Sequence, residues 1–181
     1  MPDSLTICSS DEISAADRER LWELWQAAFD GRQGFDRHDE EHTYGGVHVL
    51  ARSGDLIVGH AAVVPREIVV GERPFAAGYV EGVAVLPARQ RTGVGSAVMG
   101  LLMTELRAHH ELGVLSTGRA RGFYQRLGWE RWRGPSYVLT ASGPLRTAED
   151  DDGLMALRFG PSAAVDLTAA IACHERPGDV W

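Results

Sequence analysis

The stretch Val83-Ala-Val-Leu-Pro-Ala-Arg-Gln-Arg-Thr-Gly-Val-Gly95 joins a predicted strand to a predicted helix. Its first three residues suit a buried strand. Pairing should end at Pro87, because proline has no N–H to donate to a neighbouring strand. Between residues 96 and 109 apolar side chains recur at helical spacing, at Val98, Leu101, Leu102 and Leu106. The glycine-bearing turn between strand and helix is therefore the N-terminus of a helix.

This turn is expected to bind a phosphate group. Free N–H groups and the positive end of the helix dipole collect at a helix N-terminus, and glycines remove the Cβ atoms that would keep an anion away. Taken alone, a pair of glycines before a helix more often serves backbone geometry than a ligand. With the strand, the proline and the basic and amide side chains added, a pyrophosphate fits the turn. The residues expected to bind it are Gln90, Arg91, Thr92, Gly93, Val94, Gly95 and Ser96.

The spacing Gln90-x-x-Gly93-x-Gly95 after Val-x-Val-x-Pro resembles the acetyl-CoA pyrophosphate loop of the GNAT acetyltransferase superfamily. The family pattern is Arg or Gln, two residues, Gly, one residue, then Gly or Ala, and the match is complete. It differs from the dinucleotide-binding fingerprint, which requires Gly-x-Gly-x-x-Gly and a later acidic residue. The resemblance implies acetyl-CoA as cosubstrate and no metal ion.

The composition is that of a globular protein. The chain has 181 residues, of which 44% are hydrophobic and 24% charged, enough for one well-packed domain and short for two. We therefore expect a single acetyltransferase domain over residues 1–181. The net charge of −7 argues against nonspecific nucleic-acid binding, which requires a basic surface. Such a negative charge ordinarily serves solubility, and a negatively charged protein can also bind a cationic partner.

The start of the chain and the cysteines indicate the compartment. The first twenty residues carry several charges and no apolar core segment, so neither a secretory signal nor a membrane span is expected. Cys8 and Cys173 are far apart in the sequence, which fits reduced thiols better than a disulfide framework. We expect a cytoplasmic protein.

The rest of the chain alternates between strand and helix signals. Ser14-x-x-Asp17 has the form of a capping box, and apolar residues at helical spacing follow it as far as Phe29. A polar loop is expected from Asp30 to Glu41. Apolar runs and turn residues predict strands at 47–52, 56–64, 68–70, 75–85, 113–116, 138–139 and 154–159, another starting at 129, a helix at 119–127 and an apolar segment at 165–172. This order predicts an α/β fold with helices on both faces of a mixed, mostly antiparallel sheet, which again resembles the GNAT fold.

Acetyl transfer from a thioester to an amine needs a base, a polarised carbonyl and a proton for the departing thiolate. Glu81 lies in Tyr79-Val-Glu-Gly-Val-Ala-Val85 and is predicted to be the base, acting through water; the alternative is an exposed sheet carboxylate. Gly82 beside it suits a bulge or the close approach of a ligand. The resemblance implies that the N–H groups of Val83 and Val85 bind the acetyl carbonyl and the pantetheine arm.

The resemblance also implies a general acid. Tyr124 lies in Arg121-Gly-Phe-Tyr-Gln-Arg-Leu-Gly-Trp129, where the matched tyrosine of GNAT enzymes commonly donates a proton to the thiolate. A half-buried packing residue is the alternative interpretation of this tyrosine. Ser116 and Thr117 either cap the helix that follows them or touch the substrate.

Four separate blocks narrow the resemblance to aminoglycoside 2′-N-acetyltransferases. They are Glu41-His-Thr-Tyr-Gly-Gly46, Gly78-Tyr-Val-Glu-Gly-Val-Ala-Val85, Gly143-Pro-Leu-Arg-Thr-Ala-Glu-Asp-Asp-Asp-Gly153 and Pro177-Gly-Asp-Val-Trp181. In that family acidic side chains and the carboxylate of a terminal Trp hold a polycationic sugar. The resemblance assigns this role to Asp36, Asp39, Glu81, Ser116, Asp151, Asp179 and the carboxylate of Trp181. An early acidic residue of the family falls on Gly34 here, with Asp36 nearby as a substitute.

The sequence therefore predicts an acetyl-CoA-dependent enzyme that acetylates the 2′-amino group of aminoglycosides by direct attack of the amine. As partners we expect the antibiotic and a second copy of the chain in a homodimer, and neither nucleic acid nor a membrane; the role would be antibiotic resistance. One alternative keeps the chemistry with another amino sugar, a polyamine or a protein N-terminus as acceptor. Another is a noncatalytic protein that binds acyl-CoA or the drug.

Overall fold

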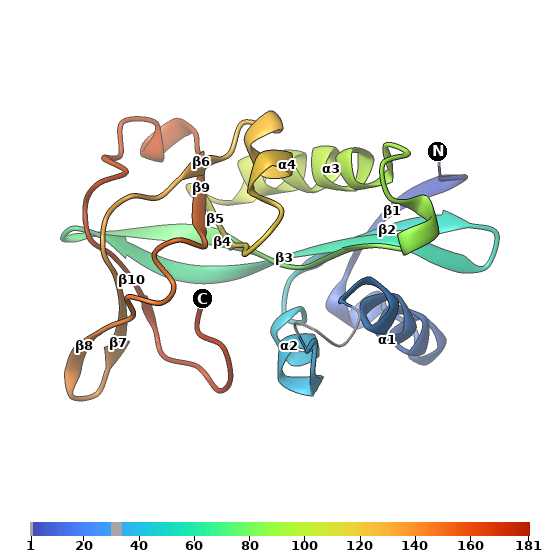
Figure 1. The fold of residues 1–181 in the computed structure, drawn as a ribbon, viewed down its shortest axis with the longest axis horizontal. Helices are drawn as coiled ribbons and strands as arrows, with labels where there is room; N and C mark the ends of the chain where they lie inside the picture. Colours follow the sequence, from blue (N-terminus) through green and yellow to red (C-terminus); the bar gives the residue numbers. More distant parts are fainter. Residues whose placement is uncertain (1, 30–33) are drawn as a thin grey trace. The chain divides into compact units, whose positions relative to one another are not determined.

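The computed structural model describes residues 2–29 and 34–181 (Figure 1). The chain forms two compact units, which we name unit 1 (Met1–Val64 and Val80–Glu105) and unit 2 (Pro65–Tyr79 and Leu106–Trp181). Two long strands, β3 (Leu56–Val70) and β4 (Arg73–Val85), contribute residues to both. None of the helices in the described ranges is both long enough and apolar enough to cross a membrane.

The sheet of unit 1 is antiparallel. Strand β1 (Ser4–Ser9) pairs with β2 (Val47–Ser53), and β2 pairs with the first half of β3. The turn between β2 and β3 contains Gly54 at a φ of 57° and joins the two antiparallel strands into a hairpin, so the strands predicted at 47–52 and 56–64 are confirmed. The short 3₁₀ helix η1 (Ser10–Glu12) links β1 to the first α-helix.

Helices lie on both faces of the unit 1 sheet. Helices α1 (Ala15–Phe29) and α2 (Arg37–His42) lie on one face and α3 (Val94–His109) on the other (Figure 1). Helix α1 begins where the sequence predicted, because the hydroxyl of Ser14 accepts a hydrogen bond from the N–H of Asp17 at 3.1 Å. Its apolar side packs into a core with β2, β3 and β4 that contains Leu21, Leu24, Trp25, Leu50, Ile57 and Ala84.

Helix α2 corrects the prediction of a polar loop from Asp30 to Glu41. Residues 30–33 lie outside the described part of the chain, but residues 37–41 are helical. The carboxylate of Asp36 accepts hydrogen bonds from the N–H groups of His38 and Asp39 and so caps the helix. The sequence did not reveal this helix because its six residues are all polar and show no apolar periodicity.

Unit 2 contains a mixed, mostly antiparallel sheet, as predicted. Its strands lie in the order β6-β9-β5-β4-β3-β10-β7-β8. The pairs β4–β5 and β10–β7 are parallel, and the pairs β5–β9, β6–β9, β7–β8 and β10–β3 are antiparallel. The elements are β5 (Leu112–Ser116), α4 (Arg121–Arg126), β6 (Glu130–Arg131), β7 (Ser136–Thr140), β8 (Gly143–Arg146), β9 (Leu154–Arg158), η3 (Gly160–Ser162) and β10 (Ile171–His174).

The strand predictions need correction at four places. Residues 56–64 and 68–70 belong to one strand, since β3 continues through Pro65, which is exposed. Strand β1 was not predicted, and it is specified by its pairing with β2. Strands β8 and β10 were not predicted as strands either. Each has only four residues, too few for an alternating pattern, and pairing with β7 and β3 specifies them.

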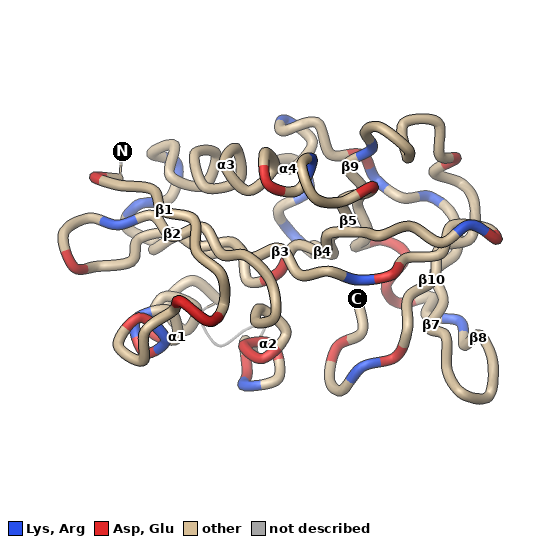
Figure 2. The backbone as a smooth tube through the Cα atoms, turned by 180° about the vertical axis from the view of Figure 1, so that it is seen from behind, with Lys and Arg blue, Asp and Glu red and all other residues tan. Residues whose placement is uncertain are grey.

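Acidic residues recur in both units. In unit 1, α1 and α2 are among the elements that carry them, and in unit 2 the segment that leads to Trp181 carries others (Figure 2). The residues of this pattern that the sequence assigned to substrate binding are Asp36 and Asp39 in unit 1 and Asp179 in unit 2.

Candidate active site

The predicted phosphate-binding turn follows β4 in unit 1. A 3₁₀ helix, η2 (Pro87–Arg89), comes first, and α3 begins at Val94, two residues before the predicted start at Ser96. Val94, Gly95 and Ser96 therefore form the first turn of the helix, whose N–H groups have no partner within the helix. The N–H of Ala97 is the next one along and bonds to the carbonyl of Gly93 at 3.0 Å. The strand, turn and helix thus follow one another as predicted.

Two side chains brace this turn. The amide of Gln90 donates to the carbonyl of Val85 at 3.3 Å, and the hydroxyl of Thr92 donates to the carbonyl of Arg89 at 2.6 Å. Arg91 is exposed and has a φ of 62°, which is uncommon for a residue with a side chain. Gly93 has a φ of 92°, a conformation that favours glycine.

The edge of β4 presents the N–H groups predicted to bind acetyl-CoA. The N–H of Leu86 donates to the carbonyl of Val58 on β3 at 3.0 Å. Successive N–H groups of a strand point to opposite edges, so those of Val85 and Val83 point away from β3. This direction is the one that a ligand along the free edge requires.

Glu81 lies just before Gly82, where the backbone of β4 departs from regular strand geometry. Its side chain is partly buried, and Gly82 beside it has a φ of 57°. The carbonyl of Gly82 accepts hydrogen bonds from the indole N–H of Trp25 at 2.9 Å and from Nδ1 of His60 at 2.7 Å. The sequence indicated Gly82 as a special backbone position but not the two side chains that hold it.

Asp36 and Asp39 cap the first turn of α2 reciprocally. The carboxylate of Asp39 accepts the N–H of Asp36 at 2.9 Å, while the carboxylate of Asp36 accepts the N–H of Asp39 at 3.1 Å. The N–H of Asp39, followed by that of His38, lowers the pKa of Asp36 below its ordinary value. Both groups therefore have a structural role in addition to the substrate role assigned from the sequence.

In unit 2, the indole of Trp181 is anchored. Its N–H donates to the hydroxyl of Thr147 at 3.1 Å, and its ring lies 6.5 Å, centroid to centroid, from that of Tyr79. Arg66 donates to the carbonyl of Val180 at 2.7 Å and so holds the preceding residue. Only 7% of Trp181 is exposed.

Asp151, assigned to the substrate by the sequence, is already engaged. One of its oxygens accepts the N–H and hydroxyl of Ser136 at 2.9 and 2.8 Å, and both oxygens accept hydrogen bonds from Arg146. Arg146 and then Ser136 lower the pKa of this carboxyl, although burial opposes them. Asp151 thus supports the turn in which it lies.

Asp150, which the sequence did not single out, has the opposite environment. Burial, then the charge of Glu149 and also that of Asp179, raise its pKa. Asp150 and Asp179 therefore place two like charges near each other, an arrangement that a cationic ligand would relieve. Three consecutive aspartates gave no sequence signal to separate Asp150 from Asp151.

Ser116 lies at the end of β5 against the same turn. A Cβ atom at Gly153 would come within 2.7 Å of its hydroxyl, and the N–H of Thr117 bonds to the carbonyl of Gly153 at 2.9 Å. The hydroxyl of Thr117 accepts the N–H of Ala120 just before α4. Thr117 thus braces the approach to the helix, and Ser116 is left exposed beside the acidic turn.

Tyr124 is a buried residue of α4. Its ring makes edge contacts with Phe123 and Trp129 at centroid distances of 5.1 and 6.2 Å. Burial raises the pKa of its hydroxyl above the ordinary value, so it stays protonated at neutral pH. A packing role and a proton-donor role for this residue are both compatible with that environment.

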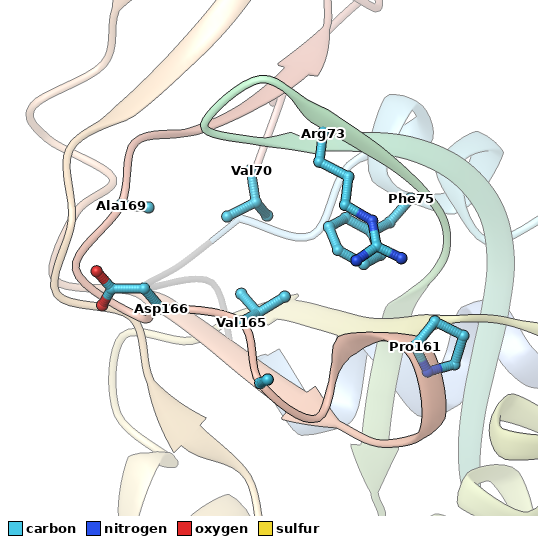
Figure 3. A pocket seen from close by; sticks show the side chains of 8 residues that line it. Val70, Arg73, Phe75, Pro161, Val165, Asp166 and Ala169 are labelled. Carbon is cyan, nitrogen blue, oxygen red and sulfur yellow. The ribbon is translucent and has the colours of Figure 1, made fainter.

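One pocket of unit 2 lies apart from these residues. Its volume is about 280 Å³, and its lining includes Val70, Arg73, Phe75, Val165 and Asp166 (Figure 3). The guanidinium of Arg73 lies 4.5 Å from the centre of the Phe75 ring. None of the residues that the sequence assigned to catalysis or binding lines this pocket.

Comparison with known proteins identifies the family. The family model of the acetyltransferase (GNAT) domain matches residues 10–132. The chain is 38% identical over 175 residues to the aminoglycoside 2′-N-acetyltransferase of Mycolicibacterium fortuitum, covering 95% of this chain and 89% of that protein.

Solved structures agree in fold. One is the GNAT family N-acetyltransferase YhbS from Escherichia coli in complex with CoA, with a TM-score of 0.66, 15% identity, and coverage of 98% of this chain and 94% of that one. Another is a GNAT family acetyltransferase from Brucella melitensis in complex with acetyl-CoA, with a TM-score of 0.61, 19% identity, and coverage of 93% and 95%. The resemblance seen in the sequence is confirmed, and the chain belongs to the GNAT family of acetyltransferases.

Proposed function

We propose that this protein is an acetyl-CoA-dependent N-acetyltransferase that acetylates the 2′-amino group of aminoglycosides by direct attack of the amine on the thioester. The observation that carries the proposal is the 38% identity to an aminoglycoside 2′-N-acetyltransferase, which extends over 95% of the chain. This similarity extends over far more of the sequence than the turn assigned to phosphate binding. The whole of residues 1–181 then acts as one acetyltransferase domain.

Acetyl-CoA binding rests on the turn before α3. The N–H groups of Val94, Gly95 and Ser96 and the guanidinium of Arg91 bind the pyrophosphate, while Gln90 and Thr92 keep the turn in shape. The N–H groups of Val83 and Val85 bind the acetyl carbonyl and the pantetheine arm along the edge of β4. Two structures of the same fold, one in complex with CoA and one with acetyl-CoA, support acetyl-CoA as the cosubstrate.

Three residues carry the chemistry. Glu81 takes a proton from the acceptor amine through water, and the N–H of Val83 stabilises the negative charge that develops on the carbonyl oxygen. Tyr124 donates a hydrogen bond to the departing thiolate. A thiolate of ordinary pKa, about 8.5, is a weaker base than the anion of a tyrosine whose pKa burial has raised. Tyr124 therefore stabilises the thiolate mainly by hydrogen bonding, and the thiol draws its final proton from solvent.

Acidic side chains bind the ammonium groups of the drug. In unit 2 we assign Asp150 and Asp179 to this role. Burial raises the pKa of Asp150, and the charges of Glu149 and Asp179 raise it further, so a cation bound there would neutralise a negative field. Ser116 and Trp181 contribute contacts, and Asp151 acts chiefly by holding the turn. In unit 1, Asp36 and Asp39 serve the drug while they cap α2.

The proposal extends to the cellular role. Acetylation of the drug in the cytoplasm would confer antibiotic resistance, and both cysteines of the chain are free thiols, as that compartment favours. A homodimer is part of the proposal. Strand β1, which leaves Leu5 and Ile7 each more than one-third exposed, offers a surface for a second copy.

A thiol-release assay tests the proposal. With acetyl-CoA present, aminoglycosides with a 2′-amine should release CoA, whereas otherwise similar drugs with a 2′-hydroxyl should not, since a hydroxyl is the weaker nucleophile. Equal turnover of both sets would overturn the assignment of the 2′ position. CoA release with polyamines or peptides but with neither drug set would favour the other acceptors. Tight acetyl-CoA binding without any release would favour a noncatalytic protein.

A further inference from the structure

A chain of buried hydrogen bonds leads from Ser10 to Gly82 within unit 1. The hydroxyl of Ser10 lies 2.9 Å from Nε2 of His48, and Nδ1 of His48 lies 3.0 Å from Nε2 of His60. Nδ1 of His60 in turn lies 2.7 Å from the carbonyl oxygen of Gly82. Both histidines are fully buried, so they contact no substrate.

The proton positions along this chain follow from its last member. A carbonyl only accepts, so Nδ1 of His60 carries the proton and donates to Gly82. In a neutral ring Nε2 of His60 then accepts, which places a proton on Nδ1 of His48 and leaves Nε2 of His48 to accept from Ser10. Burial keeps both rings neutral, lowering the pKa of His48 to about 4 and that of His60 to about 3. One arrangement of protons therefore satisfies every link.

Ser10 completes the chain at its far end. Its oxygen accepts the N–H groups of Gly45 and Gly46 at 2.9 and 3.1 Å. Its hydroxyl proton has two acceptors within reach, Nε2 of His48 at 2.9 Å and the carbonyl oxygen of Gly46 at 3.1 Å, and we place it on the shorter contact, to His48. Gly46 has no room for a side chain, since a Cβ atom there would lie 2.0 Å from the carbonyl oxygen of Val63. The backbone thus fixes Ser10, and Ser10 fixes the two rings.

The Gly82 carbonyl shares its peptide group with the N–H of Val83. In a trans peptide the C=O and the N–H point in opposite directions. Two side-chain donors, His60 and Trp25, hold the carbonyl at 2.7 and 2.9 Å, so they also set the direction of the N–H. Hydrogen bonds to a carbonyl also polarise its peptide group and make the N–H a stronger donor.

We propose that His60 and Trp25, with His48 and Ser10 behind His60, are positioning residues that aim and polarise the Val83 N–H toward the carbonyl oxygen of the acetyl group in the transition state. The inference rests on the proposed function, because it assigns a task to the Val83 N–H in acetyl transfer. It goes beyond that function in naming buried residues that act only through a peptide group. Such preorganised donors act mainly on kcat, since the oxygen gains its charge only in the transition state.

Paired substitutions of His60 test the inference. His60→Phe keeps a ring but removes the donor to the Gly82 carbonyl. In His60→Asn the side-chain amide nitrogen, Nδ2, takes the place of the histidine Nδ1 as donor. We expect kcat to fall about tenfold or more in His60→Phe, against the hundredfold or greater loss typical when an oxyanion donor is removed outright. The dissociation constant for acetyl-CoA, measured without acceptor, should stay within about twofold, and His60→Asn should recover most of the lost kcat.

Two further variants control for folding. Ile57→Ala opens a cavity in the apolar core that also contains Trp25, but it removes no hydrogen bond to the Gly82 carbonyl. It should therefore lower the melting temperature and leave kcat unchanged in the folded enzyme. If His60→Phe does not fold, Trp25→Phe removes the other donor and should lower kcat in the same way. A folded His60→Phe with wild-type kcat, or a His60→Asn as slow as His60→Phe, overturns the inference.

A measurement without turnover separates this inference from the proposed function. The ¹⁵N–¹H resonance of Val83 in the unliganded protein should shift in His60→Phe and return toward its wild-type position in His60→Asn. An unshifted resonance overturns the inference whatever the enzyme acetylates. If wild-type protein acetylates no aminoglycoside, the proposed function fails while the resonance still reports whether His60 orients the peptide.

Discussion

Gly59 lies directly against Val94: a Cβ atom at position 59 would come within 2.7 Å of Cγ1 of Val94 and 3.3 Å of Cγ2 of Val98. Val94 is the first residue of α3, so a glycine on β3 determines how closely the phosphate-binding end of the helix approaches the sheet. Valine has a stiff side chain and cannot turn aside easily.

Gly59→Ala should therefore displace the start of α3. We expect a loss of about 1–3 kcal/mol in the free energy of unfolding, which is typical of overpacking, and a rise in the KM for acetyl-CoA. Gly100→Ala is the control, because Gly100 lies in the same helix and a Cβ atom there would meet no atom within 4 Å. It should stabilise the protein by about 0.5–1 kcal/mol. Equal effects of the two substitutions would show that the contact with Val94 is unimportant.

Arg91 combines a positive charge with an unfavourable backbone. Because asparagine tolerates a positive φ better than other side chains, Arg91→Asn should leave the free energy of unfolding unchanged or higher. It should raise the acetyl-CoA KM, and Arg91→Lys, which keeps the charge, should raise it less. The two KM values and a denaturation curve for each variant check this prediction. A wild-type KM in Arg91→Asn would exclude the guanidinium from pyrophosphate binding.

Gly82 and Gly54 form a matched pair, since both have a φ of 57°. Alanine at either position costs about 1–2 kcal/mol for the left-handed backbone. Gly82→Ala costs more, because its Cβ would lie 2.7 Å from Cγ2 of Thr43 and 3.1 Å from the indole nitrogen of Trp25, whereas Gly54 has open space. We expect Gly82→Ala to be the less stable variant in denaturant titrations and to lower kcat, with Gly54→Ala active as wild type. The reverse order of stability would contradict this account.

Asp150 and Asp151 should differ in phenotype. Asp150→Asn removes a negative charge that we assign to binding an ammonium group of the drug, so the aminoglycoside KM should rise about tenfold or more. A rise of this size corresponds to the loss of a charge-assisted hydrogen bond of about 1.5–3 kcal/mol. Asp151→Asn should mainly lower the melting temperature, because the bonds to Ser136 and Arg146 weaken. Asp152→Asn, at a side chain 82% exposed, should change neither quantity much. Steady-state kinetics and thermal melts distinguish the three, and a larger KM effect at Asp151 would reverse the assignment.

The buried histidines predict a loss of stability in mild acid. Their folded pKa values, about 4 for His48 and about 3 for His60, lie below the ordinary 6.5, so the unfolded chain binds more protons between these limits. Above pH 6.5 these two histidines therefore do not lower the free energy of unfolding. Below pH 6.5 the free energy of unfolding falls as the pH drops, by about 1.4 kcal/mol per pH unit for each histidine once the unfolded state is protonated.

Denaturant titrations of wild type and His60→Asn between about pH 7.5 and 4.5 check this pH dependence. The variant has one such histidine fewer, so its stability should fall less steeply. Comparing slopes cancels the contribution of carboxylates and of other histidines that both proteins share. Parallel curves for the two proteins would show that His60 is not held neutral by burial.

Local patterns alone were enough to predict the strand, turn and helix that we assign to phosphate binding. A strand that ends at Pro87, a turn with Gly93 and a helix with apolar periodicity are each specified by neighbours in the sequence. The structure differs in forming the short helix η2 at Pro87 and in starting α3 two residues earlier. The capping box of Ser14 is local in the same sense. The general fold class follows from the order of such segments.

Only the tertiary structure decided which polar side chains support the candidate site. Asp150 and Asp151 are adjacent and chemically identical. They differ because burial raises the pKa of Asp150, whereas Arg146 and Ser136, which lie in other segments, lower that of Asp151. Helix α2 has no apolar face to reveal it, and its cap depends on the geometry at Asp36.

The hydrogen bonds of His48 and His60 are the clearest example of a feature that sequence patterns could not predict. His48 and His60 lie on paired strands, and Gly82 lies 22 residues beyond His60, so no periodicity connects the three. The sequence by itself determined the strand, turn and helix to which we assign cosubstrate binding, because periodicity and turn chemistry act over a few residues. The orientation of the Gly82–Val83 peptide was decided by the tertiary structure alone, because a hydrogen bond at 2.7 Å depends on side chains that only folding brings together.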